Sequence, residues 1–301
     1  SNNRLTAGNF APTSCYLISS LVLPSGFTNV GNFAPVLMSS LTTLTASGLT
    51  ICTGNFSPTT LHTLTSLSFP SITAVIGNIS PTTLNSVTTW NLSGVQSCNG
   101  FAPTTMNSLT SLTMPALITV GSYSPTSMNL LTTLSADGLV SCSGLFSPST
   151  MPMLSALSFT NLKYIGGVFA PTTMNMLTTW NFPNLVSVQG NIAPTTLNLL
   201  STMDFPSLLT CAAAFGPTTM SCLMSLTASG LTVVGGAFSP SILPLLPSLS
   251  FPSLTYANSF APSTFRLVTS VDFSSLAVCD GAFTPTGFSL LTTMNFPALK
   301  V

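Results

Sequence analysis

Proline recurs along the whole chain at intervals of 22 or 23 residues, and no other feature constrains the fold as strongly. A period of about 20 to 50 residues is the signature of a repeat architecture, in which each repeat stacks on its neighbours. One repeat cannot bury its apolar side chains alone, so the repeats must share a continuous core. The thirteen prolines that mark the period are Pro12, Pro35, Pro58, Pro81, Pro103, Pro125, Pro148, Pro171, Pro194, Pro217, Pro240, Pro262 and Pro285.

Apolar residues hold fixed places within each repeat. Phe, Tyr or Ile stands two residues before the proline, and apolar residues return 3, 6, 9, 11, 14 and usually 17 positions after it. The later positions alternate, as in Leu67 and Phe69, which is typical of a short strand with one buried face. The segment 80–87 favours a short helix or 3₁₀ turn, because a small polar residue followed by proline suits a helix N-terminus.

These patterns predict a repeat solenoid, a leucine-rich-repeat-like stack of thirteen turns of 22–23 residues. Each turn is expected to contain short parallel β-strands and a short helix or 3₁₀ turn. We expect residues 1–301 to form a single solenoid domain without distinct capping repeats.

The spacing within the turns also resembles a known family. LTSLSFPSITAVIGNIS, residues 64–80, and LTTWNFPNLVSVQGNIAP, residues 177–194, resemble BspA-like leucine-rich repeats over the whole chain. This resemblance implies a surface or secreted protein in an adhesion, receptor or scaffold role.

Charge is almost missing from the chain. Four Lys or Arg and four Asp or Glu make up 3% of the residues, where about a quarter is usual. Ser, Thr and Asn must therefore cover the exterior, which leaves no electrostatic field to attract nucleic acid.

No apolar run approaches the roughly 20 residues of a spanning helix, so we expect no membrane span. We expect an extracellular or cell-surface location, with a signal peptide removed before residue 1.

The residues that carry catalysis or bind metals are nearly missing as well. His62 stands alone at an expected solvent position, and Asp204 and Asp272 are three turns apart. Five of the seven cysteines share the inward position 17 with Val and Ile, where they serve as small apolar residues. We therefore predict no enzyme activity, no metal site and no cofactor.

Positions 8 and 10 after each proline are predicted to point outward from the strand and to form a two-wide polar ladder. A regular threonine array on a β-solenoid resembles the ice-binding face of some antifreeze proteins. Serine and threonine also suit solvated strand positions without any ligand, so both interpretations stay open. The threonines of the ladder are Thr43, Thr45, Thr89, Thr113, Thr133, Thr179, Thr202, Thr227 and Thr293.

The two chain ends suggest self-assembly. The first turn begins within a repeat, and the last stops near the same phase, so that a second copy would approximately complete the turn. We predict an extracellular structural protein whose subunits stack head to tail into a filament or surface fibre, with itself as partner. The residues expected at the stacking ends are Arg4, Leu5, Phe10, Phe296, Leu299, Lys300 and Val301.

Two other functions are kept as alternatives. One is ice binding by the ladder, and the other is an adhesin or ligand-binding ectodomain that contacts glycans or another surface protein. N-glycosylation sequons occur at Asn55, Asn78 and Asn91, and they match an extracellular chain.

Overall fold

The computed structural model describes residues 6–300 as a parallel β-solenoid of about 12 turns with a spacing of about 23 residues. The predicted thirteen turns exceed this number, because the turn that begins at Pro285 is not completed within the described residues. The chain forms two compact units. Unit 1 is Ser1–Ser141 with Pro148–Leu154, and unit 2 is Cys142–Ser147 with Ser155–Val301.

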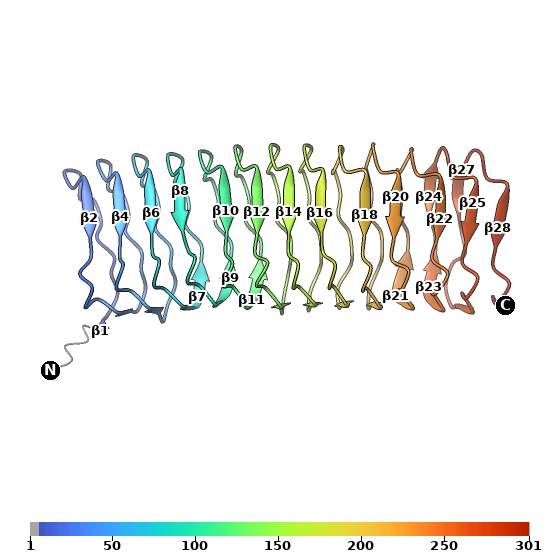
Figure 1. Cartoon of the computed structure of the whole chain (residues 1–301), viewed down its shortest axis with the longest axis horizontal. Helices are drawn as coiled ribbons and strands as arrows, with labels where there is room; N and C mark the ends of the chain where they lie inside the picture. The colour runs from blue at the N-terminus through green and yellow to red at the C-terminus, as the bar shows by residue number, and fades with distance from the viewer. Residues whose placement is uncertain (1–5, 301) are drawn as a thin grey trace. The chain divides into compact units, whose positions relative to one another are not determined.

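Unit 1 stacks two kinds of strand in alternation along the chain (Figure 1). Three-residue strands pair in parallel in the order β2-β4-β6-β8 and β10-β12, and the strands between them pair in the order β1-β3-β5-β7-β9-β11. The strands are β1 (Thr6–Ala7), β2 (Ser20–Val22), β3 (Asn29–Val30), β4 (Thr43–Thr45), β5 (Ile51–Cys52), β6 (Ser66–Ser68), β7 (Ala74–Ile79), β8 (Thr89–Asn91), β9 (Ser97–Phe101), β10 (Ser111–Thr113), β11 (Thr119–Tyr123) and β12 (Thr133–Ser135), with β13 (Ser141–Cys142) at the unit boundary.

Unit 2 repeats this arrangement. One sheet runs β15-β17-β19-β21-β23-β26, and the three-residue strands pair as β14-β16, β18-β20 and β22-β25-β28, with β24-β27 as a further pair. The strands are β14 (Ala156–Ser158), β15 (Tyr164–Ile165), β16 (Thr179–Asn181), β17 (Ser187–Val188), β18 (Thr202–Asp204), β19 (Thr210–Cys211), β20 (Ser225–Thr227), β21 (Val233–Phe238), β22 (Ser248–Ser250), β23 (Tyr256–Phe260), β24 (Ser263–Phe265), β25 (Ser270–Asp272), β26 (Val278–Cys279), β27 (Thr286–Phe288) and β28 (Thr293–Asn295).

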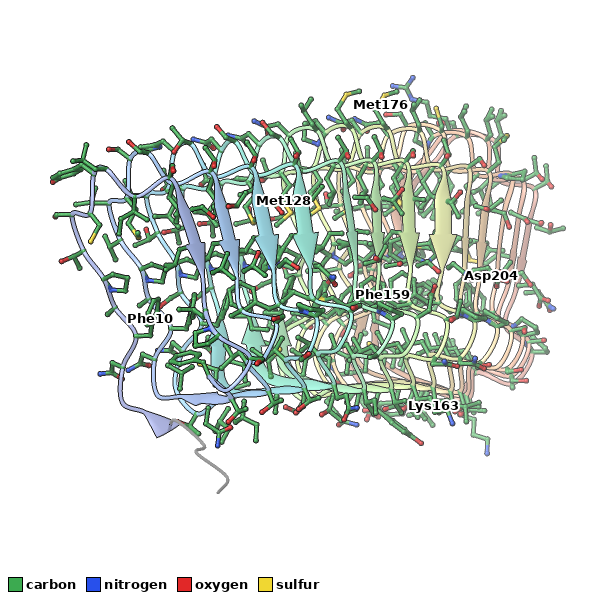
Figure 2. The ribbon with its side chains drawn as sticks, turned by 60° about the vertical axis from the view of Figure 1, so that its left-hand side comes forward. Phe10, Met128, Phe159, Lys163, Met176 and Asp204 are labelled. Carbon is green, nitrogen blue, oxygen red and sulfur yellow. The ribbon has the colours of Figure 1, made fainter. Side chains whose placement is uncertain are left out.

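The core of each unit consists of columns of identical position in successive turns. Leu44 pairs with Leu67, and Leu67 with Trp90, so each buried side chain lies over its counterpart one turn away. Every residue of these strands that points inward is apolar, and no polar or charged residue is buried among residues 6–300. Because the pleat has a period of two, this in-register stacking keeps the apolar side chains inside and Ser and Thr outside. Figure 2 shows Met128 among the inward side chains.

Two pairings between successive turns show a change in register of one residue at the same corner. Between β7 and β9, Val75 pairs with Cys98 but Asn78 pairs with Gly100, so the register shifts by one residue between these pairs. The same shift occurs between β21 and β23, again just before the Phe column. In both pairings the same corner absorbs the change in length, and the core columns on either side stay aligned.

The predicted helix or 3₁₀ turn after each proline is wrong, since residues 6–300 contain no helix. In segment 80–87, Thr82 instead forms bridges to Thr59 and Thr104, the equivalent residues of the neighbouring turns. Thr83 follows with a φ of 55°, a left-handed conformation that ends any right-handed helix. The β-bridges between turns therefore override the local helix propensity.

This left-handed position is occupied by a β-branched residue in most turns, which predicts a stabilising substitution. Ile242 has a φ of 54° and is 47% exposed. We expect Ile242→Gly to raise the free energy of unfolding by about 0.5–1 kcal/mol, because removing left-handed strain gains more than glycine loses in chain entropy. Chemical denaturation measures this change. The control Ile118→Gly, equally exposed at 48% with ordinary backbone, should lose stability, and a loss in both variants would contradict the strain argument.

Candidate functional site

The last described turn of unit 2 has an open edge. Strands β26, β27 and β28 each pair with one neighbour only, β23, β24 and β25 respectively, so one side of each backbone lacks a strand partner within the described chain. Side chains that are buried one turn earlier are exposed here. Phe283 is 38% exposed where Phe260 is 0%, and Met294 is 44% exposed where Val271 is 1%. This edge is an apolar surface with free backbone hydrogen-bonding groups.

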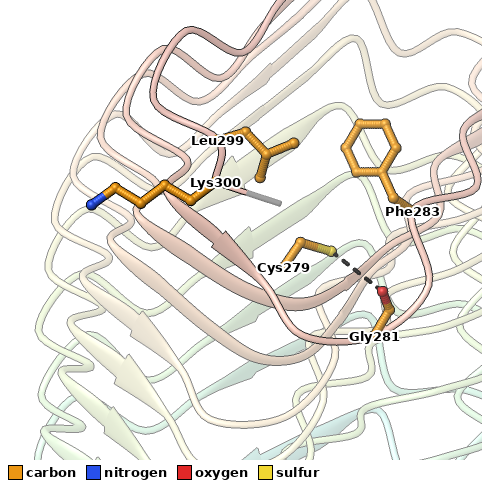
Figure 3. A pocket seen from close by; sticks show the side chains of 5 residues that line it. All are labelled: Cys279, Gly281, Phe283, Leu299 and Lys300. Carbon is orange, nitrogen blue, oxygen red and sulfur yellow. Dashed lines mark hydrogen bonds between the residues drawn. The ribbon is translucent and has the colours of Figure 1, made fainter.

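A cavity of about 320 Å³ opens at this edge and is lined by Cys279, Gly281, Phe283, Leu299 and Lys300 (Figure 3). Among the described residues that line it, Lys300 is the only cation, and its backbone N–H donates to the carbonyl of Ala277 at 3.0 Å. Burial raises the pKa of the Cys279 thiol, which points toward the Gly281 carbonyl at 3.9 Å. The cavity is mostly apolar and brings together two of the predicted stacking residues, Leu299 and Lys300.

The other predicted stacking residues are placed as follows. Phe296 packs edge-on against Phe260 and Phe283, with ring centroids 5.2 Å away in both cases. Phe10, in the first turn of unit 1, stacks on Phe33 at 5.1 Å and remains half-buried. Arg4, Leu5 and Val301 lie outside the described residues.

The first turn of unit 1 is exposed at several apolar positions. Leu17 is 94% exposed, Val22 67% and Tyr16 56%. Among the described residues, strand β2 pairs with β4 alone, and β1 pairs with β3 alone. The described part of unit 1 therefore also has an open, partly apolar strand edge at its first turn.

The predicted ladder lies on the outer face of the three-residue strands. Many of its polar groups bind one another between turns. The Ser20 and Thr43 hydroxyls are 2.9 Å apart, the Asn295 amide donates to Asp272 at 2.8 Å, and the Thr227 hydroxyl donates to Asp204. The ladder is thus regular in register, and ice binding by its threonines stays a prediction.

Asparagines form a second ladder that the sequence analysis missed. The Asn9 side-chain oxygen accepts the backbone N–H of Asn32 at 2.9 Å, and the same bond recurs from Asn55 to Asn32 at 2.8 Å and from Asn78 to Asn55 at 2.9 Å. The signal was visible as Asn three residues before the proline in four successive repeats. Two predicted glycosylation sites, Asn55 and Asn78, belong to this ladder and are exposed, as is Asn91. Glycosylation of all three stays a prediction.

Exposed apolar side chains form a further feature that the sequence analysis missed. In unit 2 the fifth residue after the proline is apolar or cysteine in six successive turns, and we name this row the apolar ridge. Figure 2 shows Met176 pointing away from the solenoid. The sequence signal was the apolar residue five positions after the proline in these turns, a position that is not among the inward ones. The ridge consists of Met176 (45% exposed), Leu199 (42%), the half-buried Cys222, Leu245 (41%), Leu267 (43%) and Leu290 (52%).

The side chains that could take part in catalysis or bind a metal do not cluster in the described part of the chain. Among residues 6–300, no three His, Cys, Asp or Glu side chains lie close enough to hold a metal ion. His62 is exposed, whereas Cys52 and Cys211 are buried in the core columns. In the same part of the chain, no helix is long and apolar enough to cross a membrane.

No protein-family model, curated protein or solved structure matches this chain. The solenoid therefore rests on the structure itself, and membership of the BspA-like leucine-rich repeats stays a prediction.

Proposed function

We propose that this chain is an extracellular structural protein, a solenoid subunit that stacks head to tail with further copies into a filament or surface fibre. The observation that carries the proposal is the open edge of unit 2, where Phe283 and Leu299 border an apolar cavity. Exposed apolar surface next to unpaired strand backbone is a template for another strand of the same kind.

The aromatic column indicates what would fit this edge. Phe238, Phe260 and Phe283 stack on one another in successive turns, with ring centroids 5.6 and 5.0 Å apart. Phe10 holds the same position in the first turn of unit 1 and stacks on Phe33. We expect Phe10 of a second copy to continue the stack on Phe283. Such aromatic pairs add about 0.5–1.5 kcal/mol each beyond area burial.

The surface chemistry supports an extracellular structural role. A neutral exterior with few Lys and Arg gives proteases such as trypsin few cleavage sites, and the charge count of four basic and four acidic residues gives little pH dependence. The resemblance to BspA-like surface repeats favours the same location. An adhesin that binds glycans or another surface protein is the alternative, and it requires a patch that specifically recognises its partner.

Electron microscopy and sedimentation velocity of the purified chain test the proposal. We expect rods longer than one subunit, in amounts that rise with protein concentration. Phe283→Lys should raise the concentration for half-assembly at least about tenfold, because it places an unpaired charge in the contact. The control Leu209→Lys, at a position 47% exposed and away from the open edge, should assemble like the wild type. A wild-type chain that stays a monodisperse monomer at high concentration would overturn the proposal.

A further inference from the structure

The apolar ridge of unit 2 is held in a regular row by the columns on both sides of it. On one side, Thr172, Thr195 and Thr218 form successive bridges, and Ser241 and Ser263 continue them. Next to the ridge, Asn198 donates to the side-chain oxygen of Asn175 at 2.8 Å. The ridge side chains therefore repeat at the spacing of paired strands, about 4.8 Å.

The first turn of unit 1 has Leu17 at this position, but the next three turns have Ser40, Thr63 and Ser86, whose hydroxyls have a structural task. The hydroxyl of Ser40 donates to the Tyr16 carbonyl at 2.5 Å, that of Thr63 to the Ser39 carbonyl at 2.9 Å, and that of Ser86 to the His62 carbonyl at 2.5 Å. A ridge residue such as Leu199 or Leu245 gives up this bond between turns and also exposes apolar surface. Both changes cost free energy in an isolated subunit, which points to a compensating contact.

We propose that the apolar ridge is a self-association surface through which two copies of this chain lie side by side. The ridge is a contiguous patch on the order of a few hundred Å², a size that marks interaction sites on soluble proteins. The polar residues that flank it would complete the roughly 800 Å² per partner of a standard interface. This contact is separate from end-to-end stacking, and it would join filaments laterally.

The period of the ridge selects the second copy as its occupant. A row of apolar side chains about 4.8 Å apart is filled evenly only by another row with the same repeat. The ridge of a second copy supplies that row, and a twofold axis makes the contact self-complementary.

Charge favours the antiparallel arrangement. Among the residues that directly precede or follow a ridge residue in the sequence, the only charged one is Arg266, which precedes Leu267. An axis between the turns of Cys222 and Leu245 keeps the two Arg266 side chains apart. The same axis brings each Arg266 next to Asn198 of the other copy. The amide oxygen of Asn198 can accept a hydrogen bond from the guanidinium group.

A charged ridge variant tests the contact in the full chain. Phe283→Lys is present throughout to weaken end stacking, and the measurements are made below the concentration at which this variant stacks. We expect sedimentation velocity to show a dimer, and the double variant Leu199→Lys, Leu245→Lys to raise its dissociation constant at least about tenfold. The control pair Tyr164→Lys, Leu209→Lys lies at exposed positions off the ridge and should leave the dimer unchanged. Circular dichroism confirms that each variant is folded.

A cross-link gives a positive readout. With Leu245→Cys, oxidation should join residue 245 of one copy to Cys222 of the other, because the proposed axis places these two positions opposite each other. Peptide mass spectrometry identifies the linkage.

Three results would overturn the proposal. These are a monomer at the highest concentration, a dimer that the ridge variant leaves intact, and a chain that stays monomeric while its ridge binds phosphatidylcholine vesicles.

Discussion

Truncating Phe238 to alanine should lower the free energy of unfolding by about 3–5 kcal/mol, the cost of removing a fully buried aromatic ring. Phe238 is 0% exposed and stacks between Phe215 and Phe260, with centroids at 5.5 and 5.6 Å. Phe251 and Phe273 also meet it edge-on, at 4.9 and 5.1 Å. The cavity would therefore border several turns at once. In a solenoid, whose stability depends on contacts between neighbouring repeats, such a site weakens the stack locally.

Urea denaturation followed by circular dichroism measures this loss. Phe283→Ala is the matched control, because it truncates the same column where the ring is 38% exposed. We expect the control to lose less than half as much stability, since less surface returns to water and no closed cavity forms. Equal losses at both positions would mean that the aromatic column does not stabilise unit 2 by packing.

The inward columns could be predicted from the sequence because they depend on hydrophobic burial alone. Leu64, Leu67 and Phe69 recur at fixed distances from Pro58, and all three are fully buried. A repeat multiplies such a weak local pattern, since each turn is an independent instance of it. The period therefore predicted the stacking and the register without any knowledge of the backbone path.

The path between the columns could not be predicted in the same way. Ser80 and Pro81 carry the local signal of a helix start, but Thr82 pairs with Thr59 and Thr104, which lie about one turn away on either side. Local propensity is a weak prior that such contacts override. Thr83 then adopts a left-handed conformation that glycine favours. Among the described turns, only the one that contains Gly287 has glycine at this position, so the sequence gives little sign of it.

The candidate surfaces were predictable only in part. Phe296, Leu299 and Lys300 were expected at a stacking end, and the structure places them at or beside the open edge of unit 2. The apolar ridge was missed because the repeat pattern was used only to assign apolar residues to the core. A residue such as Leu245 is identified as exposed only once its column is compared with its buried neighbours.

The thiol of Cys211 is expected to react with iodoacetamide at least about 100-fold more slowly than that of Cys222 at pH 8. Burial raises the pKa of the Cys211 thiol from 9.0 to about 11, which outweighs the lowering by backbone hydrogen bonds at Ile192 and Ala213. The thiolate is the reactive form, and each unit of raised pKa lowers its population about tenfold. Cys222 is half-buried at the surface of the same unit.

Peptide mass spectrometry after timed alkylation compares the two thiols within one sample. The rate at Cys211 should rise about tenfold for each pH unit up to its pKa, and in denaturant both thiols should react alike. The same pKa shift makes the folded state lose stability as the pH rises from 9 toward 11, because the unfolded chain releases this proton first. Equal rates in the native protein would show that the inward column opens to solvent, which contradicts the use of cysteine as a core residue.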